Sequence, residues 1–194
     1  DALAYNNRGN AYNKAGEYDK AIADYSEAIR IKPDFADAYI NRGNAYGKEG
    51  ELDKAIVDYT EAIRIDPDDA DAYYNRGEAY FYLEEYYKSI SDCTEAIRIK
   101  PDYAEAYDTR GLAYRLKGES DKAIADYTEA IRIDPDDALA YYNRGVTYGD
   151  LGQYDKAIAD CTEAIRIKPD LALAYNNRGN AYDELGQSDK AIVD

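Results

Sequence analysis

Apolar residues recur with helical spacing in two runs within each stretch of 34 residues. In the first stretch the positions on these faces are Tyr5, Arg8, Gly9 and Tyr12, then Ala21, Ile22, Tyr25, Ala28 and Ile29. Spacing by three and four residues predicts two amphipathic helices. Gly16 lies between the runs, and Pro33 follows the second, so each run has its own stop signal. The pattern predicts an antiparallel helix pair.

The pair repeats along the whole chain. The Arg-Gly dipeptide places glycine at Gly9, Gly43, Gly77, Gly111, Gly145 and Gly179, and proline follows the same period at Pro33, Pro67, Pro101, Pro135 and Pro169. Each unit needs a neighbour to bury its apolar face. We expect one domain over residues 1–194, with repeats at about 2–35, 36–69, 70–103, 104–137, 138–171 and a truncated 172–194.

The order Tyr5-x2-Arg8-Gly9-x2-Tyr12, Ala21-x3-Tyr25 and Pro33 resembles the tetratricopeptide repeat, over the whole chain. The resemblance implies an all-α fold, a right-handed superhelical α-solenoid of antiparallel helix pairs, with five full units and a truncated sixth. Tyrosine replaces the family's first tryptophan, arginine replaces the leucine before glycine, and tyrosine or cysteine replaces a phenylalanine in the second helix. These departures leave the fold prediction unchanged.

The third repeat is the least regular one. Glu84 stands where the other repeats have a glycine between their helices, and Ser89 replaces an alanine. We expect the turn at Glu84 to differ most from the others.

The net charge of the chain limits the classes of molecule that it is expected to bind. The net charge is −16 and the pI is about 4.4, which disfavours nucleic acid and anionic membranes and favours a neutral to basic protein or peptide. No apolar run is long enough to span a bilayer, and no basic-then-apolar leader begins the chain. Two isolated cysteines fit a reducing compartment. We expect a soluble protein, with a cytoplasmic location favoured.

Residues for catalysis or metal binding are scarce. The chain has no histidine and no phosphate-cradling glycine loop, and Cys93 and Cys161 occupy a core position that is tyrosine in other repeats. The acidic turn at residues 66–71 lacks the glycine and the fifth-position oxygen ligand of a calcium loop. We expect no enzymatic activity, no cofactor and no metal.

The recurring arginine needs a partner, because an isolated buried charge is costly. An aspartate follows each arginine by 16 residues: Arg8/Asp24, Arg42/Asp58, Arg76/Asp92, Arg110/Asp126, Arg144/Asp160 and Arg178/Asp194. We predict a salt bridge within each repeat, with glutamates such as Glu27 of an adjacent helix sharing the guanidinium. The alternative is a row of ligand-binding arginines. The invariance of the pattern favours the structural interpretation.

The first helix of each repeat has a second stripe of positions spaced by three and four, which in the first repeat are Leu3, Asn7, Asn10 and Lys14. In the tetratricopeptide family this stripe lines a concave groove that holds extended peptides or helices. Asparagines recur there, similar to the asparagine ladder of the O-GlcNAc transferase repeats, and could grip a peptide backbone. Alternatively, their amides pair with neighbouring helices. The candidate peptide-binding residues are Asn7, Asn10, Asn41, Asn44, Asn75, Tyr74, Glu78, Phe81, Tyr82, Leu112, Arg115, Leu116, Tyr142, Asn143, Val146 and Asn177.

The middle of this groove is apolar and aromatic, with Tyr74, Tyr82 and Tyr142 as candidate anchors. Alternatively, these rings fill space between first helices. A clamp for a C-terminal carboxylate, known in chaperone-binding members of the family, is disfavoured because Asn6, Asp71 and Asn75 stand where basic residues are needed. We therefore predict a scaffold that binds a peptide segment. The alternative is a self-assembling spacer segment of a larger protein with head-to-tail contacts between apolar ends.

Overall fold

The computed structural model describes residues 1–191, which form α-helices and no strand. The first helices of the repeats are α1 (Ala2–Lys14), α3 (Ala36–Lys48), α5 (Ala70–Tyr82), α7 (Ala104–Leu116), α9 (Ala138–Asp150) and α11 (Ala172–Glu184). The second helices are α2 (Tyr18–Ile31), α4 (Leu52–Ile65), α6 (Tyr86–Ile99), α8 (Ser120–Ile133), α10 (Tyr154–Ile167) and α12 (Ser188–Ala191).

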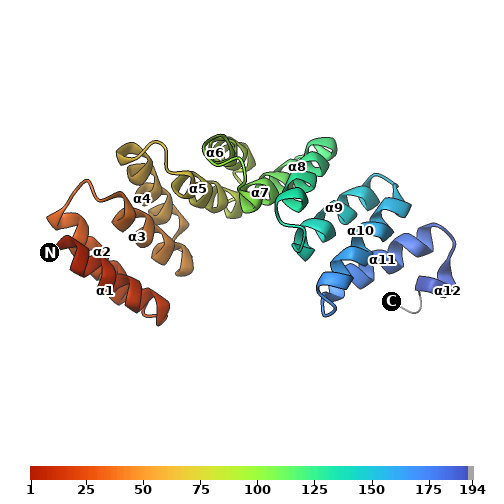
Figure 1. The fold of residues 1–194 in the computed structure, drawn as a ribbon, viewed down its shortest axis with the longest axis horizontal. Coiled ribbons are helices and arrows are strands. Elements are labelled where there is room, and N and C mark those ends of the chain that lie inside the picture. The colour runs from red at the N-terminus through yellow and green to blue at the C-terminus, as the bar shows by residue number, and fades with distance from the viewer. Residues whose placement is uncertain (192–194) are drawn as a thin grey trace. The chain divides into compact units, whose positions relative to one another are not determined.

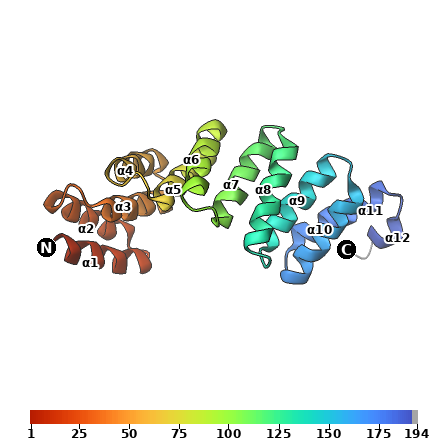
Figure 2. The same cartoon turned by 45° about the horizontal axis from the view of Figure 1, so that its top comes forward.

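The chain divides into two compact units, unit 1 over Asp1–Pro101 and unit 2 over Asp102–Asp194. Unit 1 contains α1 to α6, and each first helix packs antiparallel to the second helix that follows it (Figure 1). Unit 2 repeats this arrangement from α7 onward (Figure 2). Within each unit, first helices of successive repeats also contact one another. The predicted all-α fold of helix pairs is confirmed, and the single domain over residues 1–194 stays a prediction.

The turns between paired helices are closed by a left-handed residue. Gly16 has φ +76°, and its N–H donates to Asn13 O at 3.1 Å. The next N–H, of Glu17, donates to Tyr12 O at 2.9 Å, so both ends of a Schellman motif are formed. Glu84 adopts φ 61° at the equivalent position, and Glu85 N–H donates to Tyr80 O at 2.9 Å. The irregular turn predicted at Glu84 is thus a normal turn with a disfavoured residue in it.

The core between paired helices consists mainly of alanine. Ala21, Ala28 and Ala38 are fully buried, which allows the helix backbones to approach closely. Tyr25 is also fully buried, and its ring lies across Gly9. A Cβ atom at Gly9 would be 2.6 Å from Tyr25 Cε1, so the glycine makes room for the ring. Cys93 and Cys161 take this tyrosine position in two repeats, and both are fully buried, as predicted.

Candidate functional site

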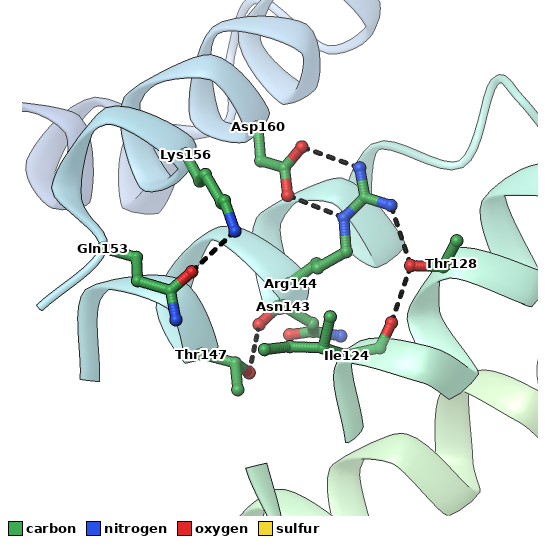
Figure 3. Close-up of polar contacts among 8 residues, drawn as sticks. All are labelled: Ile124, Thr128, Asn143, Arg144, Thr147, Gln153, Lys156 and Asp160. Carbon is green, nitrogen blue, oxygen red and sulfur yellow. Dashed lines mark hydrogen bonds and ion pairs between the residues drawn. The ribbon is translucent and has the colours of Figure 1, made fainter. Parts of the chain in front are cut away.

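The recurring arginine is a structural group. Arg144 on α9 donates from Nε to Asp160 Oδ2 at 2.7 Å and from Nη2 to Asp160 Oδ1 at 2.8 Å (Figure 3). Their side chains are 16% and 10% exposed, and this hydrogen bonding raises the pKa of the Arg144 guanidinium. The same two-point pair occurs at Arg8, Arg42, Arg76 and Arg110. The predicted salt bridges are confirmed there, and Asp194, the predicted partner of Arg178, lies outside the described residues.

The predicted sharing of the guanidinium by glutamate is wrong. Arg144 Nη1 instead donates to Thr128 Oγ1 of the preceding repeat at 3.0 Å, and Thr128 donates to Ile124 O at 2.7 Å (Figure 3). Ser26, Thr60 and Thr162 accept equivalent bonds from Arg42, Arg76 and Arg178. Glu129, next to Thr128, points about 100° away around the helix and pairs with Arg132 at 2.8 Å. The arginine therefore joins two successive repeats.

Two asparagines of the row before arginine pair with a neighbouring first helix. Asn41 Nδ2 donates to Asn6 Oδ1 at 3.1 Å in unit 1, and Asn143 Nδ2 donates to Asp108 Oδ1 at 3.3 Å in unit 2. Asn7 is exposed. The alternative in which these amides bind neighbouring helices therefore describes part of the row.

The asparagines two residues after the arginine, Asn10 and Asn44, accept hydrogen bonds from buried tyrosines. Asn10 Oδ1 accepts a hydrogen bond from the Tyr25 hydroxyl at 2.8 Å, and Asn44 Oδ1 accepts one from Tyr59 at 2.8 Å. Burial raises the pKa of Tyr25 to about 12, so the phenol remains a donor at neutral pH. Because the oxygen of each amide serves the core, its nitrogen is the group available to a ligand.

Unit 1 carries an open pocket of about 710 Å³ on the side of α3 and α5 that bears the asparagines. We call it the unit 1 pocket. Its lining comprises Asn13, Asn44, Gly47, Lys48, Gly50, Leu52, Ala55, Tyr59, Asn75, Glu78, Ala79 and Tyr82. Four of the candidate residues meet here: Asn44, Asn75, Glu78 and Tyr82. The pocket combines amide, ammonium, carboxylate and aromatic groups, which is a lining suited to a peptide.

Unit 2 has a pocket of about 220 Å³ at the equivalent place, three repeats later along the chain. This unit 2 pocket is lined by Gly145, Val146, Gly149, Asp150, Tyr154, Ala157, Asn177, Asn180, Ala181 and Glu184. Val146 and Asn177 are among the candidate residues. Lys48 of the first pocket corresponds to Asp150 here, so the equivalent sites differ in charge.

A glycine inside the first helix accounts for the position of both pockets. Gly47 and Gly149 stand where other repeats have Asn13, Phe81, Arg115 and Asp183. A Cβ atom at Gly149 would meet nothing within 4 Å, and one at Gly47 would meet only the Tyr59 hydroxyl at 3.9 Å. Sequence reasoning missed these glycines, although each is an isolated glycine inside a predicted helix, at a position that varies between repeats.

Several other candidates lie outside the two pockets. Phe81 packs against Tyr82 and Tyr86 with ring centroids 5.9 and 5.8 Å apart, and the Tyr74 hydroxyl donates to Glu78 Oε1 at 3.4 Å. Tyr142 is half-buried against the cluster that contains Ala138 and Leu171, so it fills space within the fold. Asn7, Asn10, Asn41, Leu112, Arg115, Leu116 and Asn143 line neither pocket.

Unit 2 contains two charged side chains, Arg115 and Asp108, that have no charged counterpart at the corresponding positions of unit 1. Arg115 Nη1 lies 3.4 Å from Asp150 Oδ2. Burial raises the pKa of the Tyr127 hydroxyl, and the neighbouring Arg115 side chain opposes this shift. Leu112 stands where Asn10 and Asn44 accept the tyrosine hydroxyl in unit 1. Burial raises the pKa of Asp108 to about 6, opposed by the Asn143 hydrogen bond.

Metal-binding and membrane-spanning features are absent from the described part of the chain. Residues 1–191 contain no group of three or more cysteine, aspartate or glutamate side chains arranged to hold a metal ion. Over the same residues, none of the helices has the length and apolar character needed to cross a bilayer.

Comparisons with known proteins agree with this geometry. Models described as TPR repeat match residues 9–50, 43–83 and 111–152, and models described as tetratricopeptide repeat match residues 70–103, 138–171 and 161–193. No curated protein matches the chain.

Solved structures show the same architecture. The crystal structure of MamA is 30% identical, with a TM-score of 0.78 over 84% of this chain and 96% of that one. YrrB, whose structure is described as a TPR protein with an unusual peptide-binding site, is 29% identical, with a TM-score of 0.75 over 90% of each chain. A structure from the characterisation of Pseudomonas aeruginosa pilF is 18% identical, has a TM-score of 0.87 over 99% of this chain and 87% of that one, and shows the fold alone.

The helix pairs and their surface pockets define a repeat scaffold of the protein-interaction class. This chain belongs to the tetratricopeptide repeat family.

Proposed function

We propose that the chain binds a peptide segment of a partner protein along the asparagine-bearing face of its first helices. The convergence of Asn44, Asn75, Glu78 and Tyr82 on the unit 1 pocket is the observation that carries this proposal. Asn44 is held by the Tyr59 hydroxyl, so it presents a fixed amide. Such an amide can bind a peptide backbone without selecting its side chains. The peptide-binding site named for YrrB supports the same use of this fold.

The partner segment is neutral to basic. The net charge of −16 favours approach of cationic chains, and Glu78 places a carboxylate within the unit 1 pocket. Lys48 lies on the rim of the same pocket, where it can pair with a single acidic group. Association that depends on the net charge weakens as salt screens it. The absence of catalysis and the head-to-tail spacer alternative stay predictions.

The proposal is tested with peptides selected from a random library for binding to the chain. Fluorescence polarisation then compares wild type with Tyr82→Ala and with Tyr87→Ala as the matched control. Tyr82 is 65% exposed and lines the pocket, whereas Tyr87 is 77% exposed on the second helix and does not line it. We expect Tyr82→Ala to weaken binding about tenfold and Tyr87→Ala to leave it unchanged. Equal affinities for both variants would refute binding at the unit 1 pocket.

A further inference from the structure

The floor of the unit 2 pocket differs from that of the unit 1 pocket because of a tyrosine-to-cysteine replacement. In repeat two the Tyr59 ring lies across Gly43, with Cε1 2.7 Å from the place of a Cβ atom. Cys161 occupies the corresponding position in repeat five, and its Sγ lies 3.2 Å from the Cβ place of Gly145. Tyr59 lines the unit 1 pocket, whereas Gly145 lines the unit 2 pocket. The unit 2 pocket thus reaches the glycine backbone.

The walls of this pocket keep the lining that surrounds a tyrosine ring elsewhere in the chain. In repeat one, Tyr25 packs between Ala21 and Ala45 in a single buried cluster. The equivalent residues in repeat five, Ala157 and Ala181, both line the unit 2 pocket. The lining therefore matches one that holds an aromatic ring, and position 161, which corresponds to Tyr25, is cysteine.

We propose that the unit 2 pocket receives a phenylalanine side chain of a peptide bound to unit 2, whose ring takes the place that the Tyr25 ring takes in repeat one. This inference rests on the proposed peptide-binding function. The pocket volume of about 220 Å³ is sufficient, because an engineered apolar cavity of about 150 Å³ binds benzene.

An unsubstituted ring fits better than a phenol. Asn10 accepts the Tyr25 hydroxyl in repeat one, but Val146 stands at that position in repeat five and offers no acceptor. Gly145, Ala157 and Ala181 line the pocket without a side-chain acceptor, and the buried Cys161 thiol, 3.2 Å from the Cβ place of Gly145, is only a weak one. A phenol hydroxyl at this place would lose the acceptor that Asn10 provides in repeat one, and we expect tyrosine to bind about tenfold more weakly than phenylalanine.

The rim of the pocket selects the residues beside the ring. Asp150 and Glu184 place carboxylates there, and Tyr154 donates from its hydroxyl to Glu184 Oε2 at 3.4 Å. Asn177 and Asn180 add amides that can bind the peptide backbone. Basic residues flanking the phenylalanine would lie beside the carboxylates. The matching ligand is therefore an aromatic residue within a basic peptide.

Toluene tests the pocket without any peptide. Titration is followed by the backbone amide NMR signals of Gly145 and Ala181 in wild type, Cys161→Tyr and Gly149→Asn. Cys161→Tyr restores the ring of repeats one, two and four, and Gly149→Asn adds the side chain of repeat one at a place with free space. We expect saturable shifts in wild type and at least tenfold weaker binding in both variants. A cooperative thermal unfolding transition would show that each variant is folded. If only one variant folds, it is compared with wild type alone.

Peptides then separate this inference from the proposed function. The probes are acetyl-Arg-Phe-Arg-amide, its tyrosine analogue and its alanine analogue. We expect the alanine peptide to bind at least about tenfold more weakly than the phenylalanine peptide. The inference would be overturned if toluene caused no saturable NMR shifts in wild type. It would also be overturned if toluene bound wild type and both folded variants with equal affinity. Library-selected peptides that bind while phenylalanine gives no advantage would overturn it and leave the proposed function standing. Toluene binding without any peptide binding would contradict the proposed function instead.

Discussion

Removal of Arg144 tests whether the recurring arginine is a structural group. Arg144→Leu leaves the Asp160 carboxylate, 10% exposed, without its two charge-assisted hydrogen bonds. Removing one partner of a buried ion pair costs about 3–5 kcal/mol. Arg144 is itself 16% exposed, so solvent reaches part of the pair, and we expect about 3 kcal/mol, near the lower end of that range. This loss includes the bond to Thr128 of the preceding repeat.

The assay is urea unfolding followed by far-UV circular dichroism. A repeat array can unfold in parts, so hydrogen exchange of α9 and α10 amides supplies the local free energy of opening. In Arg144→Leu/Asp160→Leu no charge remains unpaired, and we expect more than half of the lost stability to return. Additive losses of below about 1 kcal/mol each would refute the buried pair.

Arg8 provides the matched control within the same chain. It makes the same two hydrogen bonds to Asp24, but its side chain is 59% exposed, compared with 16% for Arg144. Water can replace the guanidinium more readily at an exposed pair. Arg8→Leu is therefore expected to destabilise much less than Arg144→Leu. Equal losses at both sites would show that burial does not determine the strength of the pair.

Four further substitutions test individual positions, each by urea unfolding. Glu84→Gly places glycine at φ 61°, and we expect the free energy of unfolding to rise by about 0.5–1 kcal/mol, whereas a decrease would refute strain there. Asp108→Asn removes a carboxyl group whose folded pKa is raised to about 6. The wild-type group stabilises below its unfolded pKa of about 4 and loses this contribution as pH rises through 6, so the variant should gain up to about 2 kcal/mol at pH 8 and little at pH 4. Gly43→Ala puts a Cβ atom 2.7 Å from the Tyr59 ring, whereas in Gly77→Ala the nearest atoms lie 3.1 to 3.3 Å away. We expect the first substitution to destabilise more than the second, and equal effects would contradict the close-approach argument.

Features that depend on one repeat could be predicted from the sequence. The 16-residue offset of Arg144 and Asp160 follows from two helices of known length joined by a short turn, and it gave the correct ion pair. The left-handed turn at Gly16 followed from glycine between two helical runs. Such predictions need only helix geometry and the local stop signals.

Features that depend on packing between repeats were harder to predict. The guanidinium bonds to Thr128 and not to the neighbouring glutamate, because the rotation of α8 against α9 determines which side chain faces it. Likewise, the Asn41 amide meets Asn6 of the preceding first helix. Neither contact follows from the period alone. The stripe position of Tyr142 predicts a groove residue, yet its side chain also packs against the buried residues Ala138 and Leu171.

The two pockets arise where a side chain is absent, so no chemically active residue in the sequence indicates their positions. Most positions of each repeat are committed to helix packing, so a difference between repeats changes the surface only where a side chain is lost or exchanged. Gly47 and Gly149 each give up about 0.5–1 kcal/mol of helix stability relative to alanine, and each opens space beside an asparagine. Lys48 and Asp150 then give the equivalent sites opposite charges. Ligand preference in this chain would therefore be set by the few positions where the repeats differ, and the invariant arginine would support binding only by joining the repeats.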